Sequence, residues 1–185
     1  MPTAVEYGAS YAGNQLYQRY SSRGSGSSSV DYFLKMEGVK GESQDHKHKG
    51  EIQLQSFSWG EVNAGGGAYG GGMGVGKVQM ADFCFLTHTH AGSPALMLAC
   101  ATGDHIKTAV LTCRKAGKEQ QEYLKFTFTD VMVTSFQLSG AEHLPVETVS
   151  LAYGKIEMEY KEQKNDGSLA GAVKAGWDLK ATQKV

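Results

Sequence analysis

Leu124-Lys125-Phe126-Thr127-Phe128-Thr129 decides the fold class of this 185-residue chain, because apolar and polar residues alternate strictly along it. A period of two places the apolar side chains on one face of a β-strand and the polar side chains on the other. The stretch from Ile156 to Tyr160 has the same pattern, with Glu157 and Glu159 at its polar positions. We interpret these two carboxylates as a solvated strand face and not as a general acid–base pair.

Similar runs continue from Val30 onward and predict a mainly β protein. Several antiparallel strands joined by short turns indicate a closed or nearly closed barrel. The runs are Tyr32 to Met36, Glu51 to Trp59, Lys77 to Thr87, Ile106 to Arg114, Asp130 to Phe136 and Val146 to Tyr153.

One helix is predicted among the strands, over the apolar stretch from Ala95 to Ala101. Ser93 is a favourable N-cap, Pro94 suits the first helical position, and Gly103 can end the helix. Apolar residues occupy most of its circumference. We therefore expect the helix to plug against the barrel and not to stand exposed.

The composition favours one domain and disfavours two classes of partner. Hydrophobic residues make up 41% of the chain, which is enough for a sizeable core. The formal net charge of −1 gives no general attraction to nucleic acid or to an anionic membrane. The sequence shows no long apolar run and no charged leader, so we expect neither membrane insertion nor a conventional signal peptide. Cys84, Cys100 and Cys113 are odd in number and widely spaced, which predicts reduced core thiols.

A glycine-rich segment follows the strand that ends in Ser56-Phe57-Ser58-Trp59-Gly60. Eight of the twelve residues from Gly65 to Gly76 are glycine. Glycine contributes almost no burial and loses the most chain entropy on ordering, so this segment cannot order itself. We expect a neighbouring subunit to order it.

The same segment contains two apparent nucleotide-binding patterns. Gly71 to Lys77 fits G-x-x-x-x-G-K, but Val78 replaces the hydroxyl that would bind Mg²⁺, and a strand is predicted to follow in place of a helix. Gly65, Gly67 and Gly70 match G-x-G-x-x-G, which is expected by chance in so many glycines. The sequence predicts no cofactor site.

Histidines and serines offer weak candidates for a metal or catalytic site. His46 with His48, and His88 with His90, would each share a strand face, but no nearby ligand set completes a metal site. We interpret residues 45–49 as a solvated turn. Ser58 and Ser135 are possible nucleophiles, yet no G-x-S-x-G elbow is present, and His105 and His143 lie in polar connections. We therefore predict neither a metal site nor a catalytic site.

The start of the chain differs from the rest. Met1 to Arg23 is rich in tyrosine and poor in aliphatic residues, and residues 24–29 have the composition of a flexible Gly/Ser linker. We expect residues 1–23 to be an appended peptide, possibly fused, that contributes nothing to the barrel. Residues 30–185 then form the barrel domain.

Nine short stretches of the sequence are informative through their order and spacing along the chain. They are Val30–Met36, Gly38–Ser43, Glu51-Ile52, Ser56–Gly60, Gly76–Val78, Leu96–Gly103, Arg114–Gly117, Gln121–Leu124 and Tyr160–Trp177. Together they resemble the Hcp family, the haemolysin-coregulated proteins that form the tube of type VI secretion systems. No single stretch is a strict fingerprint, but their collinear sum is specific and covers about Ser28 to Val185.

The resemblance implies a fold and an assembly. The fold is a tight antiparallel β-barrel of two sheets with one flanking α-helix, assembled as a hexameric ring with a wide lumen. Rings stack into a tube that a contractile sheath propels, tipped by a VgrG spike, from the bacterial cytoplasm into a target cell. Effectors can travel in the lumen. The resemblance thus implies a secreted structural protein, and not an enzyme.

The resemblance also assigns two candidate sites. The family's extended loop makes the contact between rings, and here it corresponds to Asn63 to Gly76, with the residues Asn63, Gly65, Gly66, Gly67, Tyr69, Gly70, Gly71, Gly72 and Met73. The strand Glu51 to Trp59 would lie at the lumen wall, with Ser58 as the candidate that faces cargo.

Two other functions remain open at this point. A small-ligand-binding barrel would need a roomy apolar interior, whereas the many large apolar residues favour a filled one. An enzyme would need His88, His90 and a carboxylate, or a similar set, to converge in space.

Overall fold

The computed structural model describes residues 30–63, 78–115, 120–140 and 144–185, which form ten strands and one helix. The helix is α2 (Ser93–Thr102). The strands are β1 (Val30–Met36), β2 (Ile52–Ser58), β3 (Glu61–Asn63), β4 (Val78–Met80), β5 (Phe83–His88), β6 (His105–Lys115), β7 (Glu122–Ser139), β8 (Val146–Gln163), β9 (Leu169–Asp178) and β10 (Gln183–Lys184).

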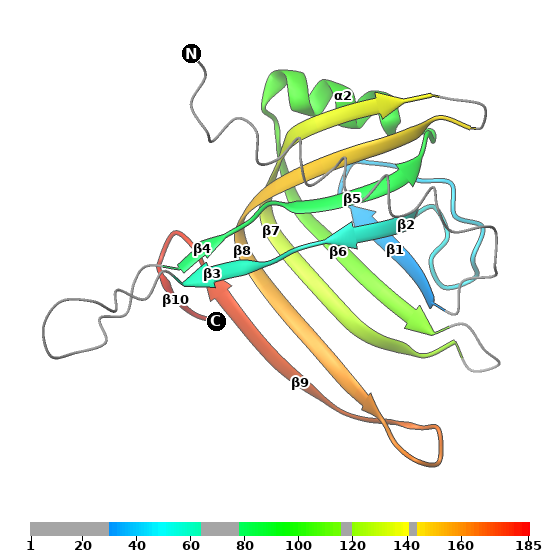
Figure 1. Cartoon of the computed structure of the whole chain (residues 1–185), viewed down its shortest axis with the longest axis vertical. Coiled ribbons are helices and arrows are strands. Elements are labelled where there is room, and N and C mark those ends of the chain that lie inside the picture. The colour runs from blue at the N-terminus through cyan, green and yellow to red at the C-terminus, as the bar shows by residue number, and fades with distance from the viewer. Residues whose placement is uncertain (1–29, 64–77, 116–119, 141–143) are drawn as a thin grey trace, which may run out of the picture.

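Six of these strands close into an antiparallel barrel (Figure 1). The order around the barrel is β8-β5-β2-β1-β6-β7, and β7 pairs with β8 to complete the circle. β9 and the short β10 extend the sheet beyond β8, whereas β3 and β4 form a separate two-stranded ribbon. The predicted tight β-barrel with two sheets and one helix is confirmed.

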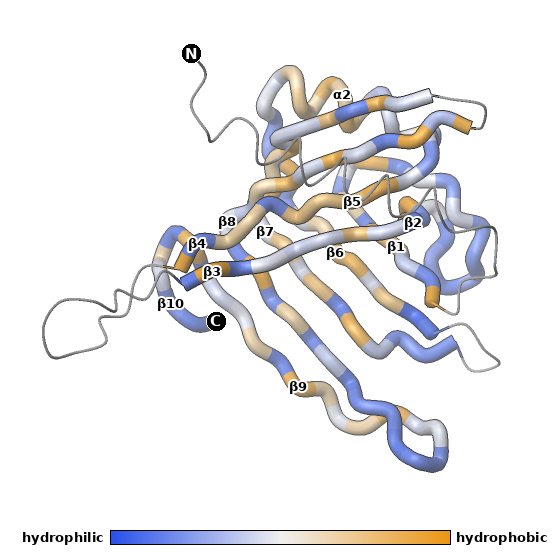
Figure 2. The backbone as a smooth tube through the Cα atoms, in the orientation of Figure 1, coloured by the Kyte–Doolittle hydropathy of each residue, from blue (hydrophilic) through white to orange (hydrophobic). Residues whose placement is uncertain are grey.

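The barrel interior is filled by aromatic and aliphatic side chains. Phe83, Phe85 and Phe128 are fully buried, and the ring centroids of Phe83 and Phe128 lie 4.8 Å apart. Apolar and polar residues alternate along the long strands, as Figure 2 shows, because one face of each strand meets this core. A filled interior leaves no room for a ligand, so the ligand-binding alternative loses its structural basis.

The helix differs in two ways from the sequence-based expectation. It begins at Ser93 itself, with Gly92 at the cap position, and the Ser93 hydroxyl makes no cap hydrogen bond to the helix. Its predicted end is confirmed, since Gly103 has a left-handed φ of 72° and its N–H donates to the Ala99 carbonyl. The helix buries only one stripe, and Met97 and Leu98 are exposed. The expected plug therefore covers the barrel with one side only.

Two of the predicted strands form one continuous strand in the structure. The runs on either side of Asp130 join into the single strand β7, in which Asp130 takes a positive φ of 56°.

The cysteines are all free; Cys84 and Cys113 are buried, and Cys100 on α2 is half-buried. No helix within the described ranges is long and apolar enough to span a membrane.

Candidate functional site

The outer surface of the barrel over β2, β5, β8 and β7 carries small hydroxyl and thiol side chains. On β5, Phe83 and Phe85 point into the core, so Cys84 and Leu86 point outward. Residues opposite one another in antiparallel strands share a face, which extends this surface across the sheet. One row consists of Ser58, Cys84, Ser150 and Ser135, and the next row consists of Ser56, Leu86, Thr148 and Gln137. We call these two rows the serine face.

Ser58 lies half-buried at the end of β2, opposite Cys84. The Cys84 Sγ is 3.2 Å from the Ser150 Oγ, and burial raises the pKa of the Cys84 thiol. A thiol held protonated is a poor nucleophile. Cys84 and Ser150 are buried, so only the half-buried Ser58 and Ser135 of this row can contact another chain, and the Cys84 thiol is not activated for catalysis.

The structure places the two candidate serines at opposite ends of one row of the serine face. Ser58 and Ser135 share a row of the serine face, but within the described ranges no hydrogen bond joins either hydroxyl to a histidine. His105 lies at the start of β6, where its Nδ1 is 2.6 Å from the Asp130 Oδ1. His143 lies outside the described residues. The described residues therefore form no triad for nucleophilic catalysis around Ser58 or Ser135.

Neither histidine pair is joined by further metal ligands among the described residues. His48 is 5% exposed, stacks on Phe33 with centroids 4.3 Å apart, and places its Nδ1 2.9 Å from the Glu51 carboxylate. The predicted solvated turn is thus correct for the exposed His46 and wrong for His48. In the part of the chain that the structure describes, no cluster of three or more metal-ligating side chains occurs.

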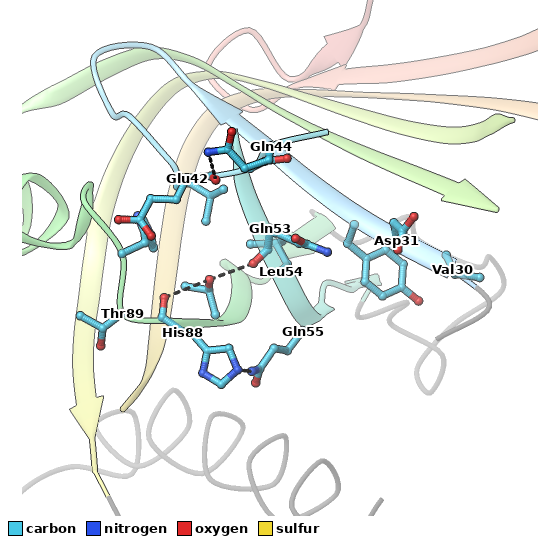
Figure 3. Close-up of a pocket in the computed structure, with 14 residues that line it drawn as sticks. Val30, Asp31, Glu42, Gln44, Gln53, Leu54, Gln55, His88 and Thr89 are labelled. Atoms are coloured by element: carbon cyan, nitrogen blue, oxygen red, sulfur yellow. Dashed lines mark hydrogen bonds between the residues drawn. The ribbon is translucent and has the colours of Figure 1, made fainter. Parts of the chain in front are cut away.

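The second pair borders a polar pocket of about 580 Å³ between residues 42–44 and the strands β1, β2 and β5. His88 and Gln55 point toward each other in this pocket and share a hydrogen bond (Figure 3). The Thr87 Oγ1 donates to the Gln53 carbonyl at 2.9 Å. Not all polar groups here are paired, because the Gln55 Oε1 and the His90 Nε2 are buried and have no hydrogen-bond partner among the described residues.

The root of the predicted ring-stacking loop is anchored on the barrel through one hydroxyl. Tyr153 is 8% exposed, its hydroxyl accepts a hydrogen bond from the Trp59 Nε1–H, and it donates to the Ala81 carbonyl at 3.1 Å. Burial raises the pKa of Tyr153 to about 12, so the hydroxyl stays protonated and can donate. Trp59 precedes β3 and Ala81 follows β4. Tyr153 therefore holds together the two segments of the chain that enter and leave this loop.

We call residues 59–63 and 78–81 the arm root, and residues 64–77 the arm. The ribbon closes with Asn63 opposite Val78, and the Ala81 N–H donates to the Gly60 carbonyl at 2.9 Å. A strand follows the glycine-rich stretch at Val78, as predicted, which removes the phosphate-binding interpretation of that stretch. The other candidate residues of the arm lie outside the described residues.

A mainly apolar groove of about 650 Å³ runs between the arm root and the strands β8 and β9. Trp59 and Met80 line it from the arm root, and Met158 and Trp177 line it from the two strands. An apolar groove beside an exposed ribbon is a surface that can receive another protein chain. The sequence pattern did not reveal this groove, because its walls come from segments far apart in the chain.

Sequence reasoning also missed a buried charge cluster that fixes the loop between β1 and β2. Arg114 is 3% exposed, and its guanidinium lies 2.9 Å from the Asp31 carboxylate and 2.8 Å from the Asp45 carboxylate. Its Cζ lies 4.8 Å from the centre of the Phe33 ring. The cluster is structural, because each charge is paired within it.

Comparisons with known proteins agree with this geometry. The family model described as "Type VI secretion system effector, Hcp" matches residues 33–160. Protein hcp1 of Pseudomonas aeruginosa is 42% identical over 155 residues, which cover 82% of this chain and 96% of that protein.

Solved structures show the same fold. The crystal structure of Hcp1 from Salmonella typhimurium has 36% sequence identity and a TM-score of 0.73, and the match covers 85% of this chain and all of that one. A type VI secretion system effector from Yersinia pestis has 32% identity and a TM-score of 0.65, with 80% of this chain and 99% of that one covered. The chain therefore belongs to the Hcp family, the structural and non-enzymatic tube proteins that type VI secretion systems assemble as hexamers and secrete.

Proposed function

We propose that this chain forms hexameric rings that stack through the arm, with the serine face lining the lumen. The observation that carries the proposal is the arm root. It is a ribbon separate from the barrel sheet, yet it is fixed to the barrel core by the Tyr153 hydroxyl. A firmly held base presents the arm in one direction, which a repeated contact between rings requires.

The placement of the lumen is supported by the chemistry of the serine face. Its rows contain no lysine, arginine, aspartate or glutamate. The members that are at least partly exposed are uncharged, and such a surface can let a folded cargo pass without strong ionic binding; they are Ser56, Ser58, Ser135, Gln137 and Thr148. Ser58 is the residue we assign to contact with effector cargo, and Ser135 lies in the same row.

The remaining partners follow from this assembly. We infer that the stacked rings carry a VgrG spike at the tip and lie inside a contractile sheath. We also infer that the protein is made in the bacterial cytoplasm and leaves it by firing of the system, without a signal peptide. The proposal includes no nucleic acid and no insertion into a membrane.

The experiment that tests the arm is a deletion of residues 65–72, followed by negative-stain microscopy. We expect single rings of normal diameter and no long tubes, because the deletion leaves every described strand of the barrel and of the arm root intact. A matched variant changes Tyr69 and Met73 to Ser in the full-length arm, which keeps its length and tests its side chains. Loss of the ring in the deletion variant would show that we have assigned the arm to the wrong interface. Tubes of normal length would show that the arm has no role in stacking.

A further inference from the structure

The side chain of His90 holds the start of helix α2 through a hydrogen bond that depends on its protonation state. Gly92, at the cap position of α2, donates its N–H to the His90 Nδ1 at 3.0 Å. A neutral imidazole carries one proton, and a ring nitrogen that accepts a hydrogen bond cannot carry it. From this bond we assign the proton of the neutral His90 ring to Nε2.

Backbone and side-chain groups around His90 take the place of a cap, because no side chain caps α2. The Ser93 N–H donates to the His90 carbonyl at 2.9 Å, and the His90 N–H donates to the Ser93 hydroxyl at 2.9 Å. The Ala91 N–H donates to the Glu42 carboxylate at 2.9 Å. Histidine is the side chain whose charge ordinarily changes between pH 5 and 8. The bond from Gly92 to the His90 ring is therefore the one that mild acid can break.

Glu147 is a buried carboxylate at the same end of the barrel. It lies on the core side of β8, opposite Thr87 of β5, and it is fully buried. Both of its carboxylate oxygens lack a hydrogen-bond partner among the described residues, and so does the buried Nε2 of His90. A buried polar group without a hydrogen bond costs free energy, and a charged one costs most. The described residues thus leave one donor and two acceptors unused.

The charges that act on His90 come from two elements, β8 and the loop between β1 and β2. Burial of the ring lowers the pKa of His90, and the negative charges of Glu147 and Glu42 oppose this shift without cancelling it. The ring is therefore neutral at pH 7. The Glu42 carboxylate already accepts from Ala91, whereas Glu147 accepts from no described residue. Glu147 is thus the acceptor available to a protonated His90 ring.

We propose that His90 is a pH-dependent switch at the start of α2, with Glu147 as the partner of its protonated ring. The neutral ring accepts from Gly92 and holds the first turn of α2. A proton taken up from solvent occupies Nδ1, so the Gly92 N–H loses its acceptor. The positive ring then lies at a helix N-terminus, where a cation is unfavourable, and it donates to the Glu147 carboxylate instead.

The switch goes beyond the proposed function, because it belongs to a single subunit and needs no ring. It also explains why a carboxylate without a partner is buried here. In the neutral state Glu147 costs stability, and in the acid state the same group offsets the burial of a charged His90 ring. Two arrangements of one ring thus satisfy different neighbours at different pH.

Hydrogen exchange of the full chain at pH 7.5 and pH 5.0, followed by mass spectrometry, tests the switch. The measured rates are divided by the intrinsic rates at each pH. A histidine with a lowered folded-state pKa contributes stability above its unfolded pKa of about 6.5 and loses it as the pH falls. We expect the protection of residues 91–96 to fall by about tenfold at pH 5.0, and the protection of β6 to stay unchanged.

Two variants separate the switch from a general effect of acid. His90→Asn keeps an acceptor for the Gly92 N–H but does not titrate, so residues 91–96 should be equally protected at both pH values. Glu147→Gln removes the charge that favours the protonated ring, so the loss of protection should move to lower pH. His46→Asn, at an exposed position, is the matched control and should keep the wild-type response.

Ring-nitrogen NMR shifts of the wild-type protein provide a second measurement that depends on no variant. They should show the proton on Nε2 of His90 at pH 7.5 and protons on both nitrogens at pH 5.0. A proton on Nδ1 at pH 7.5 would overturn the proposal. Equal protection of residues 91–96 at both pH values in the wild type would also overturn it, as would an undiminished acid response in His90→Asn. Because neither measurement needs stacked rings, a failure of the chain to form tubes would leave these results intact.

Discussion

Asp45 and Arg114 show how single residues fix the loop between β1 and β2. Burial opposes ionisation of the Asp45 carboxyl, but hydrogen bonds from the Lys47 N–H and from Arg114, together with the charge of Arg114, outweigh it and lower the Asp45 pKa. A carboxyl with a lowered folded-state pKa contributes stability above its unfolded pKa of about 3.9 and loses that stability as the pH falls through the folded pKa.

We therefore predict a pH-dependent effect of Asp45→Asn. At pH 7 the substitution should reduce the free energy of unfolding by about 1–2 kcal/mol, since a charged hydrogen bond is replaced by a neutral one. The difference from the wild type should shrink below about pH 4, where the wild-type carboxyl also becomes neutral. Urea unfolding at pH 7, 5 and 3 measures this difference. Asp104→Asn, at an exposed position after α2, is the control and should show no such trend; a pH-independent difference for Asp45→Asn would contradict the prediction.

Individual buried polar residues were the part of the molecule that the sequence predicted least well. The alternating pattern shows which side of a strand a residue occupies, but not what lies above it. His48 was expected in solvent because lysines flank it, yet the loop folds back so that its ring stacks on Phe33. Glu147 is fully buried on the core side of β8, although the strand pattern has no way to distinguish it from a surface carboxylate.

The arm root is a ribbon that one side chain of β8, Tyr153, joins to the barrel by hydrogen bonds. We predict that Tyr153→Phe loosens this ribbon and leaves the barrel folded. The ring of Tyr153 packs against Phe128 with centroids 5.1 Å apart, and phenylalanine retains this contact. Only the hydroxyl is lost, which leaves the Trp59 indole N–H and the Ala81 carbonyl without their partner at a cost of about 1–3 kcal/mol.

Hydrogen exchange separates a local effect from a global one. The amides of β3 and β4 should exchange faster in Tyr153→Phe, whereas the amides of β6 should keep their wild-type order of protection. Tubes should become shorter at equal protein concentration. Tyr160→Phe is the matched control on the same strand for the exchange rates of β3 and β4 only, because Tyr160 is 45% exposed. Unchanged exchange in β3 and β4 would show that the hydroxyl does not set the direction of the arm.

Strands along which apolar and polar residues alternate regularly were predicted from the sequence. A strand that lacks this alternation and depends on pairing with another strand was not. Phe126 and Phe128 show their inward face in the sequence itself. β9 was missed as a strand because Gly171 and Gly176 interrupt it and alanines fill much of the rest; it is extended because β8 offers it a partner. The helix was predicted at nearly the right place, but its all-apolar composition hid which side meets β7.

The whole molecule leaves part of its inward-facing surface uncovered. β8 lies between β7 and β9 here, and Met158 and Tyr160 of β8 and Val173 of β9 face the same side as the core residue Phe126 of β7. Their exposed fractions are 41%, 45% and 71%. The alternation predicted the apolar side of β8 with Met158 and Tyr160, but not Val173, because β9 was missed; only the chain topology shows that no described element closes over this face. An apolar face of this kind is typical of an interface between subunits.

We predict that Val173→Asp prevents the hexamer from forming. A charge placed in a dry contact between subunits loses its hydration without gaining a partner, so the association constant should fall by at least about a hundredfold. Size-exclusion chromatography with light scattering should then give monomers where the wild type gives hexamers, with an unchanged circular dichroism spectrum. Ala172→Asp is the matched control, since Ala172 is the exposed neighbour on the opposite side of β9. Hexamers in Val173→Asp would show that the ring closes through another surface and that this apolar face meets a different partner in the assembled system.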